Sequence, residues 1–362
     1  MDIVPQKILI IRLSAIGDVV RTLPALRALR HRFPSAYIAW IVEDSAQDIL
    51  EGHPDLDHLF VFKRKRWSKG FFSLHNFWRF LRETIDFLKE VRGKHFDLVL
   101  DFHGIFKSGF LSFLSGVPMR VGFSRHYSKE FNYLFNNHHI ALETDAISRI
   151  DRNLNFIRFL DIHDDKQEPI IPITNEDRQY IDNFFKEKGI SEHAPLIAIH
   201  PGTSKNTLYK RWNISYYAAV ADKLIERLGA KIIWTWGPGE LDCAEKVVEK
   251  MKNESIIACK TERLRQLAEI FRRCDLFLGS DSGPMHIASF VKTPVAVIYG
   301  PTDPVVNAPY EKNPHLVLRK DLPCNPCRKR NCQSIECMDM VKPDEVFDAV
   351  CKLLKTRSGI VV

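Results

Sequence analysis

Three loops of the sequence combine acidic, basic and hydroxyl side chains in patterns that could bind phosphate groups and accept a proton. In the first loop, RLSAIGDVVRTLPAL, Asp18 follows the apolar run 7–13 and stands near the start of a helical segment. A carboxylate held there could act as a general base, and the simpler alternative is a helix cap. The loop lacks the G-x-G-x-x-G fingerprint, so a nicotinamide-dependent oxidoreductase is disfavoured.

The second loop, HPGTSKNTLYKRW, has the residue types that suit a diphosphate. Its glycine and the hydroxyls of Thr203 and Ser204 offer hydrogen-bond donors, and Lys210 and Arg211 supply positive charge. The alternative is an ordinary solvated loop.

The third loop, FLGSDSGPMHIASF, places polar residues where a strand ends and a helix begins. Asp281, Ser282 and Gly283 follow the apolar run, and the free N–H groups of the helix that starts at Gly283 could receive a phosphate. His286 lies one turn further on. A capping aspartate and a packed histidine are the alternative. In the weaker WGPGE turn, Glu240 could accept hydrogen bonds from ribose hydroxyls.

Short apolar runs alternate with segments of helical period, which is typical of parallel strands joined by crossover helices. The expected strands are 7–13, 37–42, 58–62, 97–102, 120–123, 196–200, 231–236, 255–259, 276–279 and 295–299. The segment HDDKQEPIIPIT interrupts this rhythm. We therefore predict two doubly wound α/β domains, 1–168 and 169–345, followed by a C-terminal helix and tail at 346–362. Ligands of such folds bind beyond the carboxyl ends of strands, where all these loops lie.

The composition excludes several classes of protein. The 362 residues are 45% apolar and 27% charged, as in a soluble globular protein rather than a disordered or collagenous one. No apolar run approaches the ~18–20 residues of a spanning helix, and none forms a signal peptide. Four of the eight cysteines crowd between Cys324 and Cys337, unlike the framework of a small secreted module. We expect a cytoplasmic protein.

Positive charge is concentrated in one part of the chain. The net charge is +7, yet residues 58–130 alone carry 14 Lys and Arg against 6 Asp and Glu. Such an excess points to an anionic partner: a phosphorylated lipid, a nucleic acid or a membrane surface. The basic segment 63–69 lacks the interleaved aromatics and recognised motifs of a nucleic-acid-binding protein.

The segments IRLSAIGDVVRTLPAL, HPGTS with KRW, and SDSGPMHIAS with VIYGPTDP resemble, in this order, the bacterial heptosyltransferases of glycosyltransferase family 9. These enzymes build the inner core of lipopolysaccharide. The resemblance spans nearly the whole chain. It implies the GT-B fold, in which two Rossmann-like domains face each other across a cleft, with the acceptor on the first domain and the donor nucleotide on the second. Asn213 departs from the proline that often follows K-R-W.

The resemblance also assigns roles to residues. It makes Asp18 the catalytic aspartate and Lys210 the lysine that contacts the donor phosphate. The other donor-binding residues that it implies are Thr203, Ser204, Glu240, Asp281, Ser282, Gly283 and His286. The donor would be ADP-L-glycero-β-D-manno-heptose, and the resemblance implies neither a metal nor a cofactor.

The implied reaction is a single displacement with inversion onto the inner Kdo of Kdo-lipid A. Asp18 would take the proton of the attacking hydroxyl, while Lys210 and the helix start at Gly283 stabilise charge on the departing ADP. The segments DFHGIFKSG and FNNHHIALETDAISRIDRNL look more like the enzyme that adds the first heptose (heptosyltransferase I). The alternatives are heptosyltransferase II, another GT-B transferase with a different nucleotide sugar or acceptor, and a noncatalytic nucleotide-sugar-binding protein.

The acceptor of this family carries phosphates and Kdo carboxylates, so the basic residues of the first domain become candidates for binding it. They are Lys65, Arg66, Lys107, Arg125 and Lys129, all of which follow predicted strand ends. A solvated loop is the alternative for the basic segment. A lipid acceptor also implies peripheral contact with the inner face of the cytoplasmic membrane.

The cysteine-rich segment LPCNPCRKRNCQSIECM has the spacing C-x2-C-x4-C-x4-C. This is neither the spacing of a zinc ribbon nor that of a ferredoxin. Reduced thiols in a loop are favoured over a structural metal or a redox pair.

Overall fold

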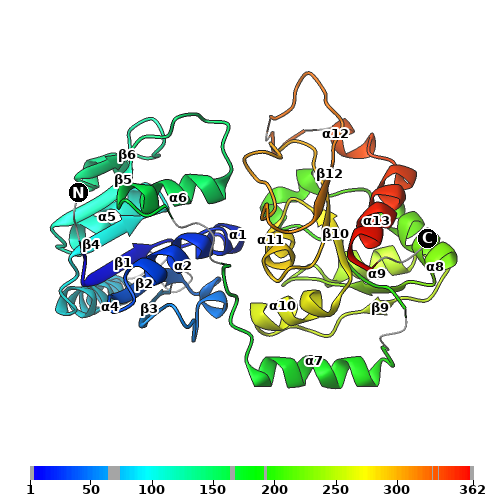
Figure 1. The fold of residues 1–362 in the computed structure, drawn as a ribbon, viewed down its shortest axis with the longest axis horizontal. Helices are drawn as coiled ribbons and strands as arrows, with labels where there is room; N and C mark the ends of the chain where they lie inside the picture. Colours follow the sequence, from blue (N-terminus) through cyan, green and yellow to red (C-terminus); the bar gives the residue numbers. More distant parts are fainter. Residues whose placement is uncertain are drawn as a thin grey trace. The chain divides into compact units, whose positions relative to one another are not determined.

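The computed structural model describes residues 4–63, 74–163, 168–190, 194–327, 329–332 and 334–358. The chain forms two compact units, Met1–Pro172 and Ile173–Val362 (Figure 1). The division lies between Pro172 and Ile173, whereas we predicted a boundary after residue 168. It falls within the PIIPIT stretch, where two prolines prevent a continuous helix.

Unit 1 is built on a parallel sheet of six strands in the order β3-β2-β1-β4-β5-β6. The strands are β1 (Lys7–Ile11), β2 (Tyr37–Glu43), β3 (His58–Phe62), β4 (Leu98–Asp101), β5 (Met119–Phe123) and β6 (His138–Ile140). The first five confirm the predicted strands. Strand β6 was not predicted, because its three residues, HHI, form no apolar run.

The helices of unit 1 cover both faces of this sheet. They are α1 (Ile16–Val20), α2 (Leu23–Arg32), η1 (Gln47–Ile49), α4 (Leu74–Gly93), α5 (Phe106–Leu114), η3 (Asn132–Phe135) and α6 (Arg149–Phe159). Val91 of α4 and Leu111 of α5 share one core cluster with Leu9 and Ile11 of β1. The connection from β1 to β2, which contains α2, and the connection from β3 to β4, which contains α4, run in opposite directions along the sheet. Because both crossovers are right-handed, α2 lies on the face opposite to α4. There α2 packs with α6.

Unit 2 repeats this architecture with the strand order β12-β11-β10-β7-β8-β9. The strands are β7 (Leu196–His200), β8 (Lys231–Trp234), β9 (Ile256–Ile257), β10 (Leu276–Ser280), β11 (Val295–Ile298) and β12 (His315–Leu318). The helices are α7 (Asn175–Glu187), η4 (Lys205–Lys210), α8 (Ile214–Leu228), α9 (Leu241–Val248), α10 (Leu264–Arg273), α11 (Gly283–Phe290), α12 (Glu336–Asp339) and α13 (Pro343–Ser358). Both sheets are parallel and doubly wound, as predicted.

Helix ends in both units follow local sequence signals. The helical segment that contains Asp18 is broken into α1 and α2, and Pro24 lies in the first turn of α2, where its missing N–H costs nothing. Gly229 ends α8 in a left-handed conformation (φ 61°). Helix α13, which we set apart from the second domain, packs on α8 and on β10, β11 and β12 and so belongs to unit 2.

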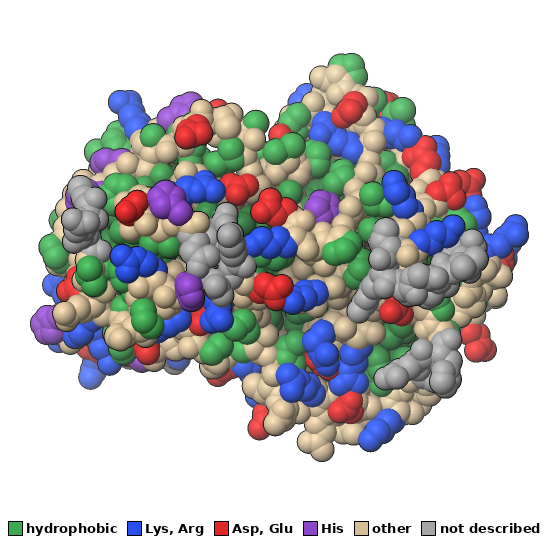
Figure 2. Space-filling view, viewed as in Figure 1, with side chains coloured by type: hydrophobic (Ala, Val, Ile, Leu, Met, Phe, Trp, Pro, Cys, Tyr) green, Lys and Arg blue, Asp and Glu red, His purple; other side chains and the backbone are tan. Residues whose placement is uncertain are grey.

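The surface carries acidic and basic side chains side by side over most of the face shown in Figure 2. In the part of the chain that the structure describes, no helix combines the length and the apolar character needed to cross a bilayer.

Candidate functional site

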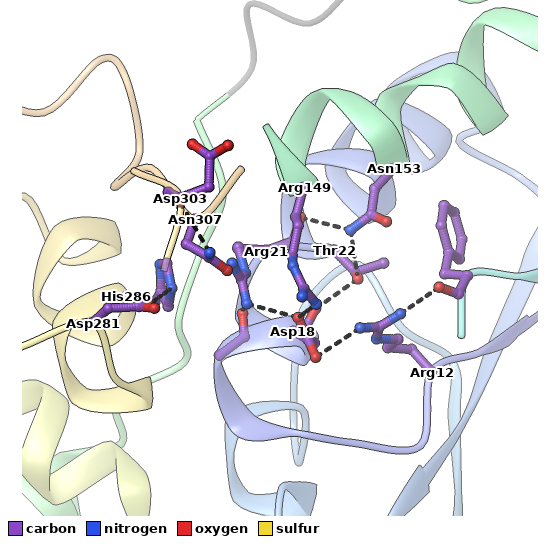
Figure 3. A network of polar contacts seen from close by, with 12 residues as sticks. Arg12, Asp18, Arg21, Thr22, Arg149, Asn153, Asp281, His286, Asp303 and Asn307 are labelled. Carbon is purple, nitrogen blue, oxygen red and sulfur yellow. Dashed lines mark hydrogen bonds and ion pairs between the residues drawn. The ribbon is translucent and has the colours of Figure 1, made fainter. Parts of the chain in front are cut away.

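Asp18 lies in the first turn of α1, directly beyond the carboxyl end of β1, and three arginines surround its carboxylate (Figure 3). Its Oδ2 is 2.9 Å from Arg12, and its Oδ1 is 2.7 Å from Arg21 and 3.0 Å from Arg149. The N-cap of α1 is Ala15, so the capping alternative for Asp18 is wrong. Three guanidinium groups favour the ionised carboxylate, which is still 17% exposed.

Buried contacts hold these arginines in place. The guanidinium of Arg12 donates a hydrogen bond to the carbonyl of Phe102, and burial lowers the pKa of Arg12 although the facing carboxylate opposes this shift. One turn into α6, the side chain of Asn153 donates to the carbonyl of Arg21 (3.1 Å) and to Thr22 Oγ1 (3.0 Å). The start of α6 is therefore tied to the junction between α1 and α2.

His103, in the loop after β4, is a neutral imidazole near this cluster. Burial, with the positive charge of Arg12, lowers the pKa of His103 to about 3. Its Nδ1 accepts the N–H of Leu13 (3.1 Å), so the ring proton is on Nε2. The backbone N–H of His103 donates to Asp101 Oδ1 (3.0 Å), which fixes the loop. His103 can therefore offer a hydrogen bond to a substrate, but it is a very weak base.

Two of the proposed acceptor-binding residues lie on neighbouring segments of unit 1, Lys107 in the first turn of α5 and Lys129 in the loop after β5. Lys107 Nζ is 2.8 Å from Glu43 Oε1 and 4.1 Å from the centroid of the Phe62 ring. The backbone N–H of Lys129 donates to the carbonyl of Gly104 (2.8 Å), which brings the loop after β5 beside the loop after β4. Lys107 is thus partly neutralised, whereas the side chain of Lys129 is exposed.

Of the other three proposed acceptor-binding residues, the structure describes one. Arg125 is exposed, and its guanidinium carbon is 5.7 Å from the Tyr133 ring centroid. Lys65 and Arg66 lie outside the described residues.

In unit 2, Lys210 and Asp281 form a buried ion pair beside the start of α11. Lys210 Nζ is 2.8 Å from Asp281 Oδ2, and His286 Nε2 is 4.0 Å from Asp281 Oδ1. Gly283 is the first residue of α11, and the Oγ of the preceding Ser282 is buried with no hydrogen-bond partner among the described residues. The hydroxyl of Ser282 and the first N–H groups of α11 can therefore bind an anion.

The hydroxyls of Thr203 and Ser204 are used within their own loop. Thr203 Oγ1 donates to the carbonyl of Thr207 (3.2 Å), and Ser204 Oγ bonds Thr207 Oγ1 (2.9 Å). Arg211 donates to the carbonyl of Thr203 (3.1 Å). These bonds hold the turn that ends at Lys210.

The carboxylate of Glu240 joins the loop after β7 to the loop after β8. Its Oε2 accepts the N–H of Gly237 (3.0 Å) and is 3.2 Å from His200 Nε2. Burial acts to raise the pKa of Glu240, but hydrogen bonds from His200 and Gly237 and the nearby charge of Arg211 together lower it. A Cβ at Gly202 would lie 2.6 Å from Oε2, so this approach requires glycine.

The four clustered cysteines line one small cavity of about 40 Å³ in unit 2. They are Cys324, Cys327, Cys332 and Cys337, and all four are free thiols. Within the described ranges, no three His, Cys, Asp or Glu side chains stand in metal-binding geometry.

Sequence reasoning missed several residues of these clusters. Arg12 and Arg21 lie six residues before and three after Asp18, and the helical i, i+3 spacing of the second could have indicated the contact. Arg149 is 131 residues from Asp18 in the chain, and no local pattern connects them. His200 was also missed, because in the sequence it is simply the last residue of a predicted strand.

Comparison with known proteins gives a consistent result. Residues 84–337 match the family model described as glycosyltransferase family 9 (heptosyltransferase). The lipopolysaccharide core heptosyltransferase OpsX of Haemophilus influenzae is 29% identical over 86% of this chain and 84% of its own length. The lipopolysaccharide heptosyltransferase 1 of Pseudomonas aeruginosa is 26% identical over 90% and 87%.

Solved structures share the whole fold. A glycosyl transferase family 9 protein from Veillonella parvula superposes with a TM-score of 0.80 at 25% identity, covering 98% of this chain and 99% of that one. The E. coli heptosyltransferase WaaC, solved with ADP, has a TM-score of 0.72 at 22% identity, with 96% and 99% covered.

Proposed function

Because the chain belongs to glycosyltransferase family 9, the heptosyltransferases, and has their GT-B fold, we propose that it transfers L-glycero-D-manno-heptose from ADP-heptose to the inner Kdo of Kdo-lipid A. The observation that carries the proposal is the carboxylate of Asp18, held by three arginines beyond the end of β1. A carboxylate that is fixed in position and still reachable can act as the general base for an acceptor hydroxyl.

The proposed chemistry is a single displacement at the anomeric carbon. The acceptor oxygen forms its bond to that carbon as the bond to the ADP oxygen breaks, and the electron pair leaves with ADP. Asp18 takes the proton of the hydroxyl. Its three arginines contact both carboxylate oxygens. The side chain of Arg149 is 32% exposed, so an acidic group of the acceptor can reach it and draw it away from Asp18.

Unit 2 supplies the donor side of the proposal. Lys210 and the N–H groups at the start of α11 stabilise the charge that develops on ADP. Glu240, whose lowered pKa keeps it ionised, accepts hydrogen bonds from ribose hydroxyls. Asp281, Ser282, Gly283 and His286 complete this site. Because the hydroxyls of Thr203 and Ser204 already bond their own loop, we assign these two residues the role of shaping it.

On the acceptor side, we propose that Lys65, Arg66, Lys107, Arg125 and Lys129 bind the phosphates and carboxylates of the lipid. The protein then works in the cytoplasm, at the inner face of the membrane. The scheme assigns no step to a metal ion, a cofactor or a nucleic acid.

One assay tests the proposed reaction. Purified protein is incubated with ADP-heptose and either Kdo-lipid A or Kdo-lipid A that already carries one heptose, and the lipids are weighed by mass spectrometry. We expect one added heptose on the first acceptor only. Addition to the second acceptor alone would identify heptosyltransferase II. Transfer from another nucleotide sugar, but not from ADP-heptose, would contradict the proposed donor.

A further inference from the structure

Unit 1 exposes a group of large apolar side chains on α5 and η3. They are Phe106 (48% exposed), Phe110 (41%), Phe113 (53%), Phe131 (67%) and Leu134 (66%), and we call them the aromatic patch. A soluble protein tolerates isolated exposed apolar residues, but a contiguous group usually marks a surface that binds a membrane or another protein.

The three phenylalanine rings of α5 in this patch gather around one central side chain. The half-buried ring of Phe135 lies 5.2 Å from Phe106, 5.9 Å from Phe110 and 6.3 Å from Phe113, measured between centroids. Phe106 and Phe110 stack at 5.8 Å. These distances are those of favourable aromatic pairs. The three phenylalanines of α5 therefore form one continuous apolar surface with Phe135.

A buried polar network fixes α5 and η3 to the end of β4. Asp101 Oδ2 accepts hydrogen bonds from Ser108 (3.0 Å) on α5 and from Asn132 (2.6 Å) on η3. A Cβ at Gly109 would lie 2.6 Å from Asn132 Nδ2, so only glycine allows this close packing. The aromatic patch is thus preformed on a rigid support.

The chain segment that carries the aromatic patch is mostly positive, although Glu43 pairs with its Lys107. Residues 106–139 contain four Lys and Arg, namely Lys107, Arg120, Arg125 and Lys129, and one acidic residue, Glu130. Apolar rings with a cationic border complement a bilayer of anionic lipids, whereas two copies of this chain that met patch to patch would repel each other.

We propose that the aromatic patch docks unit 1 onto an anionic lipid bilayer, with its rings among the headgroups and acyl boundary and its cations on the headgroup phosphates. The inference rests on the proposed function in one respect, which is that the acceptor is itself a membrane lipid. Docking through α5 and η3 brings Lys107, in the first turn of α5, and Lys129, on the loop before η3, to the surface of the membrane that holds the acceptor.

The test uses the full chain and vesicles of equal parts phosphatidylethanolamine and phosphatidylglycerol, without acceptor. The triple variant Phe106→Ser/Phe110→Ser/Phe113→Ser should lower the partition coefficient in flotation at least about tenfold. Phe131→Ser alone, on a separate segment, should lower it less. The control, Val317→Ser/Met340→Ser, changes similarly exposed side chains in unit 2 (42% and 43%) and should bind as wild type. Phosphatidylcholine vesicles should bind the wild type weakly.

Three results would overturn the inference: no binding of wild type to the anionic vesicles, unchanged binding of both patch variants, or equal loss in the unit 2 control. Sedimentation gives one more outcome, since a wild-type dimer that the triple variant dissociates, without vesicle binding, would assign the aromatic patch to a second copy. Circular dichroism checks that the variants fold. Vesicle binding without heptose transfer would refute the proposed function and leave the docking surface standing.

Discussion

Replacing Asp18 by asparagine keeps the size of the side chain and removes the charge that three arginines surround. Two of these partners, Arg12 and Arg21, are nearly buried, at 2.9 and 2.7 Å from the carboxylate. Removing one partner of a buried ion pair costs about 3–5 kcal/mol. The lower end applies here, because water partly screens Asp18 and Arg149. A loss of about 3 kcal/mol lowers the Tm by roughly 6–12 °C.

The same substitution should lower turnover by about 10²–10⁴, the usual effect of losing a general base. The dissociation constant of ADP-heptose should change only a few fold, because the proposed donor-binding residues all belong to unit 2. Turnover is measured at saturating donor and acceptor, well below the Tm of the variant. Calorimetry gives the donor affinity, and circular dichroism gives the Tm.

Asp55→Asn is the matched control for the cost in stability. Asp55 is also a buried carboxylate of unit 1, paired at 2.7 Å with Arg27, and it lies outside the Asp18 cluster. This variant should lose stability but keep its turnover. A folded Asp18→Asn protein that retains more than a tenth of wild-type turnover would refute the assignment of the base. If both variants were equally inactive, the loss of turnover would be due to impaired folding.

The remaining predictions concern charge, metal and thiol chemistry. Lys210→Ala should weaken ADP binding by about 1.5–3 kcal/mol, and an unchanged affinity in calorimetry would place the phosphate site elsewhere. Neutralising Lys65 and Arg66 together should raise the acceptor KM at least about tenfold. A double variant whose KM equals that of the wild type at both low and high salt would make the segment an ordinary solvated loop. Saturating EDTA should leave the rate unchanged, so a loss that Mg²⁺ restores would contradict the metal-free displacement. Cys332 should react with iodoacetamide faster than Cys337. Backbone hydrogen bonds lower the pKa of the Cys332 thiol, whereas burial and neighbouring thiols raise the pKa of the Cys337 thiol. Peptide mass spectrometry measures the two rates, and equal rates would contradict this prediction.

The sequence predicted best what is decided locally. Apolar runs and helical periods identified both doubly wound sheets, and the rule that ligands bind beyond strand ends singled out Asp18 and Asp281. What it could not predict are contacts between distant segments. Nothing near Arg149 indicates that it faces Asp18, and nothing near Lys210 indicates that Asp281 neutralises it. Such pairs depend on how crossover helices pack, which only the folded chain determines.

The close packing of α5 and η3 makes certain positions depend on each other during evolution. A Cβ at Gly109 would lie 2.6 Å from Asn132 Nδ2, and one at Gly122 would lie 2.3 Å from Asn136 Nδ2. The two asparagines also bond each other (3.3 Å). A larger residue at either glycine is therefore tolerated only together with a smaller one at its partner. Among homologous sequences, these four positions should covary as a single unit. A substitution at one of them should therefore be accompanied by a compensating substitution at its partner.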